Sequence, residues 1–232
     1  MNLSIIIPVY NERDFIVSVI HRLEQSNCQD CQLIFVDDGS TDGTRELLEQ
    51  HVPEPCERIF LPVNRGKTAA VMAGLELATR DWIIIQDADL EYDPNDILRL
   101  YQRAESSIEQ PVAVYGRRPS CWWQPSRWPF VLGVLTIDIW LWILFRQWVR
   151  DHASCYKLLP RQVINEIGLQ STGFEGCVEI TAKLMAGGIP ILQIPISYTP
   201  RSYREGKKLL ARYWFTALRT AWQLGRFDTI RI

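Results

Sequence analysis

An acidic stretch follows a short apolar segment near the middle of the chain. Asp87, Asp89 and Glu91 come directly after the run of isoleucines at residues 83–85, at intervals of two. Side chains two positions apart point to the same side of an extended chain, so the three carboxylates share one face if the strand conformation persists. Like charges this close repel, and burying them is costly without a positive partner. Converging carboxylates favour a hard cation, and we predict a Mg2+ or Mn2+ site with Asp87 and Asp89 as its main ligands and Glu91 as a third.

The alternative is a structural role for these acids, as helix caps or as solvated residues of a turn. This role accounts well for Asp93, because Pro94 follows it and proline is favoured in the first turn of a helix. For Asp87 and Asp89 we favour the metal site.

The elements that must position these acids alternate along the first half of the chain. Strands are predicted at residues 4–9, 33–36, 58–63, 82–85 and 112–115, and helices at residues 14–23, 41–50, 67–78 and 94–104. This alternation implies βαβ units and an α/β fold with a mostly parallel central sheet and helices on both faces. Ligands of such sheets bind beyond the carboxyl ends of the strands, which is where the unusual residues of this chain lie.

The composition is that of an ordinary globular protein of 232 residues, with 47% hydrophobic and 22% charged residues and a formal net charge of −2. Such a chain is long enough for one large domain. The charge gives no indication of a nucleic-acid partner. Six cysteines without a preceding signal-peptide pattern favour a reducing, cytosolic setting.

Two segments of the second half carry many aromatic residues. Residues 128–149 contain only Asp138 and Arg146 as charges, and the 18 residues from 128 to 145 are marginal for a spanning helix. We predict an interfacial or shallowly embedded helix there, with a core helix or a homo-oligomer contact as the alternatives. Residues 207–227 predict a basic amphipathic helix, which suits either an anionic lipid surface or docking on the core with a solvated basic stripe.

Several motifs in fixed order carry a resemblance to a known family. The segments "IIIPVYNE", "FVDDGSTDGT", "NRGKTAAVMAGLELA" and "DADLEYDP" resemble glycosyltransferase family 2 with the Rossmann-like GT-A fold. The later segments "DHASCYKLLPR", "GFEGCVEITAKL" and "PISYTPRSYREGKK" are similar to the branch of dolichol-phosphate mannosyltransferase and bacterial polyprenyl-phosphate glycosyltransferases. The resemblance covers nearly the whole chain.

The resemblance implies a binding site for a nucleotide sugar. Its residues would be Pro8, Tyr10, Glu12, Asp37, Asp38, Gly66, Lys67 and Asp87, with Arg201 and Lys207 of the later basic motif. Asp37 serves equally well as a structural cap and ranks below Asp38. A helix that begins at Lys67 would also favour the diphosphate through its N-terminal amides. The metal held by Asp87 and Asp89 would bridge that diphosphate, whereas the branch often has glutamine where this chain has Glu91.

The resemblance also implies a second site, for the phosphate of the acceptor. Arg117, Arg118 and Arg127 match positions where the family places contacts to that phosphate. Asp151 matches an aspartate near the acceptor, as a base or an orienting group, and His152 is a weaker candidate. The catalytic residues would be Asp89, Asp151 and Arg117.

The function implied is the inverting, metal-dependent transfer of a sugar from a GDP- or UDP-linked donor to a polyprenyl phosphate, either dolichyl phosphate or undecaprenyl phosphate. The protein would lie at the cytoplasmic face of a membrane, peripheral or shallowly embedded. One alternative is a transferase with a soluble saccharide acceptor, and another is an inactive membrane-associated scaffold. The expected domains are a nucleotide-sugar half at residues 1–120, an interface or dimer helix at 121–150, an acceptor half at 151–206 and a basic helix at 207–232.

Overall fold

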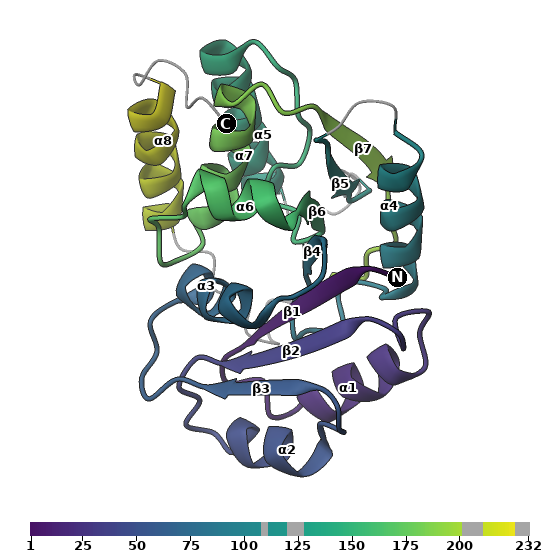
Figure 1. Cartoon of the computed structure of the whole chain (residues 1–232). Coiled ribbons are helices and arrows are strands. Elements are labelled where there is room, and N and C mark those ends of the chain that lie inside the picture. The colour runs from purple at the N-terminus through teal and green to yellow at the C-terminus, as the bar shows by residue number, and fades with distance from the viewer. Residues whose placement is uncertain (108–110, 120–127, 201–210, 226–232) are drawn as a thin grey trace.

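A seven-stranded sheet runs through the protein (Figure 1). The computed structural model describes residues 1–107, 111–119, 128–200 and 211–225. The strands are β1 (Leu3–Val9), β2 (Gln32–Asp37), β3 (Glu57–Phe60), β4 (Trp82–Ile85), β5 (Ala113–Arg117), β6 (Lys157–Pro160) and β7 (Ile191–Pro195). Their order in space is β3-β2-β1-β4-β6-β5-β7. The predicted mostly parallel sheet is confirmed, since among these seven described strands β6 alone runs antiparallel, to both β4 and β5.

The helices lie between the strands and around the sheet. They are α1 (Ile16–Glu24), α2 (Thr44–His51), α3 (Lys67–Leu77), α4 (Asn95–Glu105), α5 (Trp128–Phe145), α6 (Arg161–Ile167), α7 (Gly176–Ala186) and α8 (Ala211–Gly225). Figure 1 shows α1 and α2 beside β1–β3, and α5, α7 and α8 gathered at the other end of the sheet. All four predicted helices of the first half are present, and Asp93 accepts a hydrogen bond from the Asn95 amide at the start of α4, as predicted (3.0 Å).

The inner strands are buried along nearly their whole length. The three isoleucines of β1 and those of β4 have almost no exposed surface, because helices cover the sheet on both faces. Gly74 of α3 lies against Ile6 and Val36, so α3 packs closely on β1 and β2. The sheet core thereby fixes the carboxyl ends of β1, β2 and β4 relative to one another.

Helices α5 and α8 pack against each other. Trp140 and Trp222 stack with their ring centroids 5.8 Å apart, and the indole of Trp214 donates a hydrogen bond to the Thr136 hydroxyl (2.9 Å). Ala217 of α8 is also buried. The described part of α8 is therefore docked on the protein through its apolar side, which is one of the two predicted alternatives. Among the helices of the described ranges, none is long and apolar enough to cross a membrane.

Candidate active site

The carboxyl ends of β1 and β2 are joined by short polar contacts. The Asn11 amide donates to the Ser40 hydroxyl (2.9 Å), and the Thr41 amide donates to the Asn11 side chain (2.9 Å). The Glu12 amide donates to the Thr44 hydroxyl (3.0 Å). The structure thus brings the predicted donor residues Pro8, Tyr10 and Glu12 to the same edge as the second strand's aspartates, with Tyr10 exposed and Glu12 half-buried.

The two aspartates at the end of β2 have different partners. Asp37 is fully buried and forms an ion pair with Arg45 (2.6 Å), which also donates to the Leu61 carbonyl. Asp38 accepts hydrogen bonds from the amides of Arg65 and Gly66, both at 2.8 Å. Asp37 thus makes contacts that fit its structural alternative, while Asp38 holds in place the loop that leads into Lys67.

Lys67 at the start of α3 forms an ion pair with Asp87, directly beyond β4. Burial disfavours the ammonium charge, but the Asp87 carboxylate outweighs burial and holds the pKa of Lys67 well above its ordinary value. Burial likewise raises the pKa of Asp87, and the neighbouring Lys67 more than reverses this, so that the pKa of Asp87 is lowered. Both groups are charged at neutral pH, and the positive partner of Asp87 is Lys67.

The other two acids of the motif turn to different partners. Asp89 accepts a hydrogen bond from the Glu91 amide (3.1 Å), and the Glu91 carboxylate accepts one from the Tyr198 hydroxyl (2.7 Å). Over the described ranges, no three or more acidic, histidine or cysteine side chains gather as a metal site. A cluster of Asp87, Asp89 and Glu91 is therefore not found in this part of the chain, because the chain leaves the extended conformation after β4 and the three residues take different partners.

The first turn of α3 is closed by a loop from the second half of the chain. The Thr172 carbonyl accepts hydrogen bonds from the amides of Thr68 (2.8 Å) and Ala69 (3.2 Å). Gly66 approaches so closely that an added Cβ would lie 2.5 Å from the Thr172 oxygen. A carbonyl therefore occupies two of the amides that were expected to face a diphosphate, and the diphosphate contact stays a prediction.

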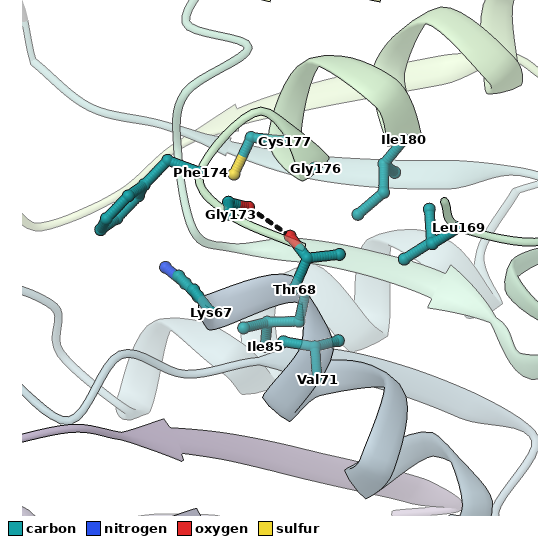
Figure 2. A pocket seen from close by; sticks show the side chains of 10 residues that line it. All are labelled: Lys67, Thr68, Val71, Ile85, Leu169, Gly173, Phe174, Gly176, Cys177 and Ile180. Carbon is teal, nitrogen blue, oxygen red and sulfur yellow. Dashed lines mark hydrogen bonds between the residues drawn. The ribbon is translucent and has the colours of Figure 1, made fainter. Parts of the chain in front are cut away.

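That loop is anchored by a buried ion pair on α7. Glu179 accepts hydrogen bonds from the amides of Gln170 and Ser171, both at 2.8 Å, and pairs with Lys183 at 2.6 Å. The loop places the ring of Phe174 5.8 Å from the Lys67 amino group. Figure 2 shows Lys67 and Phe174 at the same small pocket, with the hydrogen bond from Thr68 to the Gly173 carbonyl beside them. Glu179 was not among the predicted site residues.

A second ion pair joins the end of β5 to the segment after α5. Arg118 donates to both carboxylate oxygens of Asp151, from Nε at 2.9 Å and from Nη2 at 2.5 Å, and its backbone amide donates to the same carboxylate at 3.1 Å. The guanidinium carbon lies 5.1 Å from the centre of the Tyr198 ring. Burial alone would lower the pKa of Arg118, but the Asp151 carboxylate raises it well above its ordinary value. This is a fixed, bidentate pair of charges.

The predicted acceptor residues are only partly assembled in the described residues. Arg118 and Asp151 form an ion pair. Arg117, the last residue of β5, directly precedes Arg118 and is half-buried. Arg127 lies outside the described residues, as do Arg201 and Lys207 of the predicted donor site.

Two residues of this region were missed by the sequence analysis as site residues. Tyr198 contacts Glu91 through its hydroxyl and Arg118 through its ring, so it connects the acidic motif to the second ion pair. Asp138 of α5 is buried and accepts hydrogen bonds from the Asp151 amide (2.8 Å) and the His152 amide (3.1 Å). The signal for Asp138 was present, since it is the single acid of an otherwise uncharged apolar segment.

Comparison with known proteins identifies the family. Residues 4–168 match the sequence model of glycosyl transferase family 2. The chain belongs to this family. It is 40% identical over 121 residues to the undecaprenyl-phosphate 4-deoxy-4-formamido-L-arabinose transferase of Pseudomonas fluorescens, a match that covers 50% of this chain and 36% of the relative. The corresponding enzyme of Serratia proteamaculans is 32% identical over 129 residues, covering 53% and 40%. The matches thus span about two-fifths of the length of these family 2 relatives.

Solved structures confirm the GT-A-like fold of this family 2 protein. A glucosyl-3-phosphoglycerate synthase from Mycobacterium tuberculosis, crystallised with Mn2+, UDP-glucose and phosphoglyceric acid, superposes with a TM-score of 0.70 at 16% identity, covering 98% of this chain and 81% of that one. A further mycobacterial protein gives a TM-score of 0.76 at 17% identity, covering 98% and 76%. At this identity the likeness concerns the fold.

Proposed function

We propose that this family 2 protein is an inverting, metal-dependent glycosyltransferase that moves a sugar from a GDP- or UDP-linked donor to polyprenyl phosphate. The observation that carries the proposal is the presence of two separate cation–carboxylate pairs at one edge of the sheet, Lys67 with Asp87 and Arg118 with Asp151. The reaction brings two phosphate-bearing substrates together, and each needs positive charge in its own place. The similarity to undecaprenyl-phosphate transferases supports this choice of acceptor.

The donor would bind at the ends of β1, β2 and β4. Asp38 and Glu12 lie at this edge and would accept hydrogen bonds from the nucleoside, and Lys67 would neutralise the diphosphate. The leaving diphosphate gains charge as the bond to the sugar breaks, and a nearby ammonium stabilises that charge.

The donor chemistry at the end of β4 also suits a divalent cation. Asp87 and Asp89 supply carboxylate oxygens, and Mg2+ is commonly held by one or two carboxylates together with substrate phosphates. Bound there, the cation would act as a Lewis acid on the diphosphate. Glu91, engaged by Tyr198, is the weakest of the three proposed ligands. The solved relatives with Mn2+ and UDP-glucose support a metal-dependent reaction.

The acceptor phosphate would bind at the second pair. A phosphomonoester has a second pKa of about 6, so its attacking oxygen is largely ionised at neutral pH and needs little help from a base. We therefore propose that Asp151 orients Arg118, and that Arg117 and Arg118, with Arg127, hold the phosphate. The attacking oxygen forms the new bond to the anomeric carbon as the diphosphate leaves from the opposite side, which inverts the configuration.

A lipid acceptor requires contact with a membrane, and the outer face of α5 suits that contact. Five large apolar residues on this helix are exposed: Trp128, Leu132, Ile139, Trp142 and Ile143. They fall within about 100° of one another on a helix of 3.6 residues per turn. We propose that this stripe lies in the headgroup region at the cytoplasmic face, with the protein peripheral or shallowly embedded.

The test is an assay of GDP- and UDP-linked sugars with polyprenyl phosphate, with and without Mg2+ or Mn2+. We expect one donor to give metal-dependent transfer to the lipid phosphate, and Asp89→Ala to reduce it at least about 100-fold. Transfer to a soluble saccharide and none to the lipid phosphate would favour the second enzyme hypothesis. No turnover of any donor with either acceptor would favour the inactive scaffold, provided that the protein is folded.

A further inference from the structure

We propose that Asp138 is a positioning residue that ties helix α5 to the turn carrying Asp151 and so sets the orientation of the Arg118–Asp151 pair. The inference rests on the proposed function for its kinetic consequence. It assigns a role to a buried carboxylate that supports the acceptor site through the backbone of Asp151 and is not itself proposed to touch a phosphate.

The contacts of Asp138 use both of its oxygens. One accepts a hydrogen bond from the Asp151 amide at 2.8 Å. The other accepts from the His152 amide at 3.1 Å and lies 2.6 Å from Nδ1 of the His152 ring. Asp138 and His152 are both almost fully buried, at 2% and 3% exposure. A single carboxylate thus satisfies three donors of two consecutive residues.

The turn held in this way has an unusual backbone. Asp151 adopts a φ of +63°, in the left-handed region that residues other than glycine seldom occupy. A hydrogen bond from the Ser154 amide to the Asp151 carbonyl closes the turn (3.1 Å). In this conformation the Asp151 amide points at Asp138 while its carboxylate points at Arg118. The Asp138 contact therefore stabilises the backbone geometry on which the bidentate pair depends.

Packing alone does not explain an acid at this place. Residues 128–145 contain no other charge, and the core side of α5 at Ile137 and Leu141 is apolar. A buried carboxylate is costly unless its hydrogen bonds are satisfied, so an apolar residue would suit a helix that serves only as cover. The same helix carries the exposed apolar stripe on its outer face. Asp138 thus joins the proposed lipid-facing helix directly to the proposed acceptor site.

The test compares Asp138→Asn with a matched variant, Thr136→Val, in the full chain. Asparagine keeps one acceptor oxygen but turns an N–H group toward an amide donor, whereas Thr136→Val removes a hydrogen bond between α5 and α8 and leaves the Asp151 turn intact. We expect Asp138→Asn to lower kcat/KM for polyprenyl phosphate in vesicles at least about tenfold and to leave the KM for the nucleotide sugar within about twofold. Thr136→Val should keep both parameters near those of the parent.

Hydrogen exchange separates this inference from the proposed function. In Asp138→Asn the Asp151 and His152 amides should exchange at least about tenfold faster, with no comparable change in Thr136→Val, whether or not polyprenyl phosphate is the acceptor. If the parent protein transfers no sugar to the lipid phosphate, the proposed function fails while this readout still tests the turn. Unchanged exchange, or equal kinetic losses in both variants, would overturn the inference.

A second pair of variants tests the same inference if Asp138→Asn does not fold. His152→Asn retains a side-chain N–H near the position of ring Nδ1, whereas His152→Phe has none. We expect His152→Asn to keep most of the polyprenyl-phosphate activity and His152→Phe to lose it with an unchanged nucleotide-sugar KM. The same loss in both would contradict the role assigned to Asp138.

Discussion

The two ion pairs at the edge of the sheet differ in how firmly they are held. Lys67 meets one oxygen of Asp87, and the two side chains keep 18% and 24% of their surface exposed. Arg118 meets both oxygens of Asp151, with 10% and 12% exposed, and Asp151 is fixed in addition by Asp138. Lysine is a compact charge on a flexible stem, whereas arginine presents a planar fork that matches a carboxylate. The first pair is thus suited to exchange its partner for a diphosphate, and the second to hold a fixed geometry.

Removing one acid from each pair should reveal this difference most strongly. Asp151→Ala leaves a buried guanidinium without its partner, and we expect it to reduce the free energy of unfolding by about 3–5 kcal/mol. Asp87→Ala should cost less, because Lys67 can extend toward water. Urea denaturation of both variants measures the difference. Equal losses would contradict the distinction between a fixed and an exchangeable pair.

A smaller effect is expected where the donor side meets the loop at Thr172. Gly66 has a φ of +99°, and Gly66→Ala would add both backbone strain and a collision with the Thr172 carbonyl. We expect a loss of about 1–3 kcal/mol in unfolding free energy and a higher KM for the nucleotide sugar. Gly188 is the matched control, since it has a φ of +70° with open space around its Cβ position. If Gly188→Ala matches Gly66→Ala in stability and donor KM, the close contact has no role.

The smallest effect concerns the anchor of that loop. Burial raises the pKa of Glu179, but its bonds to Lys183 and Ser171 outweigh burial, so the net pKa is lowered. A carboxylate with a lowered pKa in the folded state stabilises the protein at pH values above the ordinary pKa of glutamate. This stabilisation is lost as the pH falls through the pKa of the folded state. Glu179→Gln should therefore flatten the decline of stability below about pH 4.5.

Thermal unfolding between pH 3 and pH 6 measures this slope. The exposed Glu24→Gln serves as the control and should leave the decline as steep as in the parent. An unchanged slope in Glu179→Gln would show that the Glu179 carboxylate does not stabilise the loop.

On the donor side the sequence could indicate which segments lie together, for a physical reason. Parallel strands place their carboxyl ends together, so the motifs after β1, β2 and β4 had to meet once the alternation of strands and helices was recognised. The sequence could not predict that Lys67 faces Asp87, because this contact depends on where the chain turns after Ile85. Nor could it predict that Thr172 closes the start of α3.

On the acceptor side, the decisive contacts join distant residues through an irregular topology. β6 inserts antiparallel between β4 and β5, and Arg118, just after β5, pairs with Asp151 in the segment that leads from α5 to β6. Asp138 could be recognised as unusual from its apolar surroundings, but its partners could not. Tyr198 gave no signal, because aromatic residues are common in strands and their ends.

The most direct test of the account is a pair of KM measurements on Lys67→Gln and Arg118→Gln, with each substrate varied while the other is saturating. We predict that Lys67→Gln raises mainly the KM for the nucleotide sugar and Arg118→Gln mainly the KM for polyprenyl phosphate, each by at least about tenfold. If both variants raise the KM of the same substrate, the assignment of one ion pair to each phosphate is wrong.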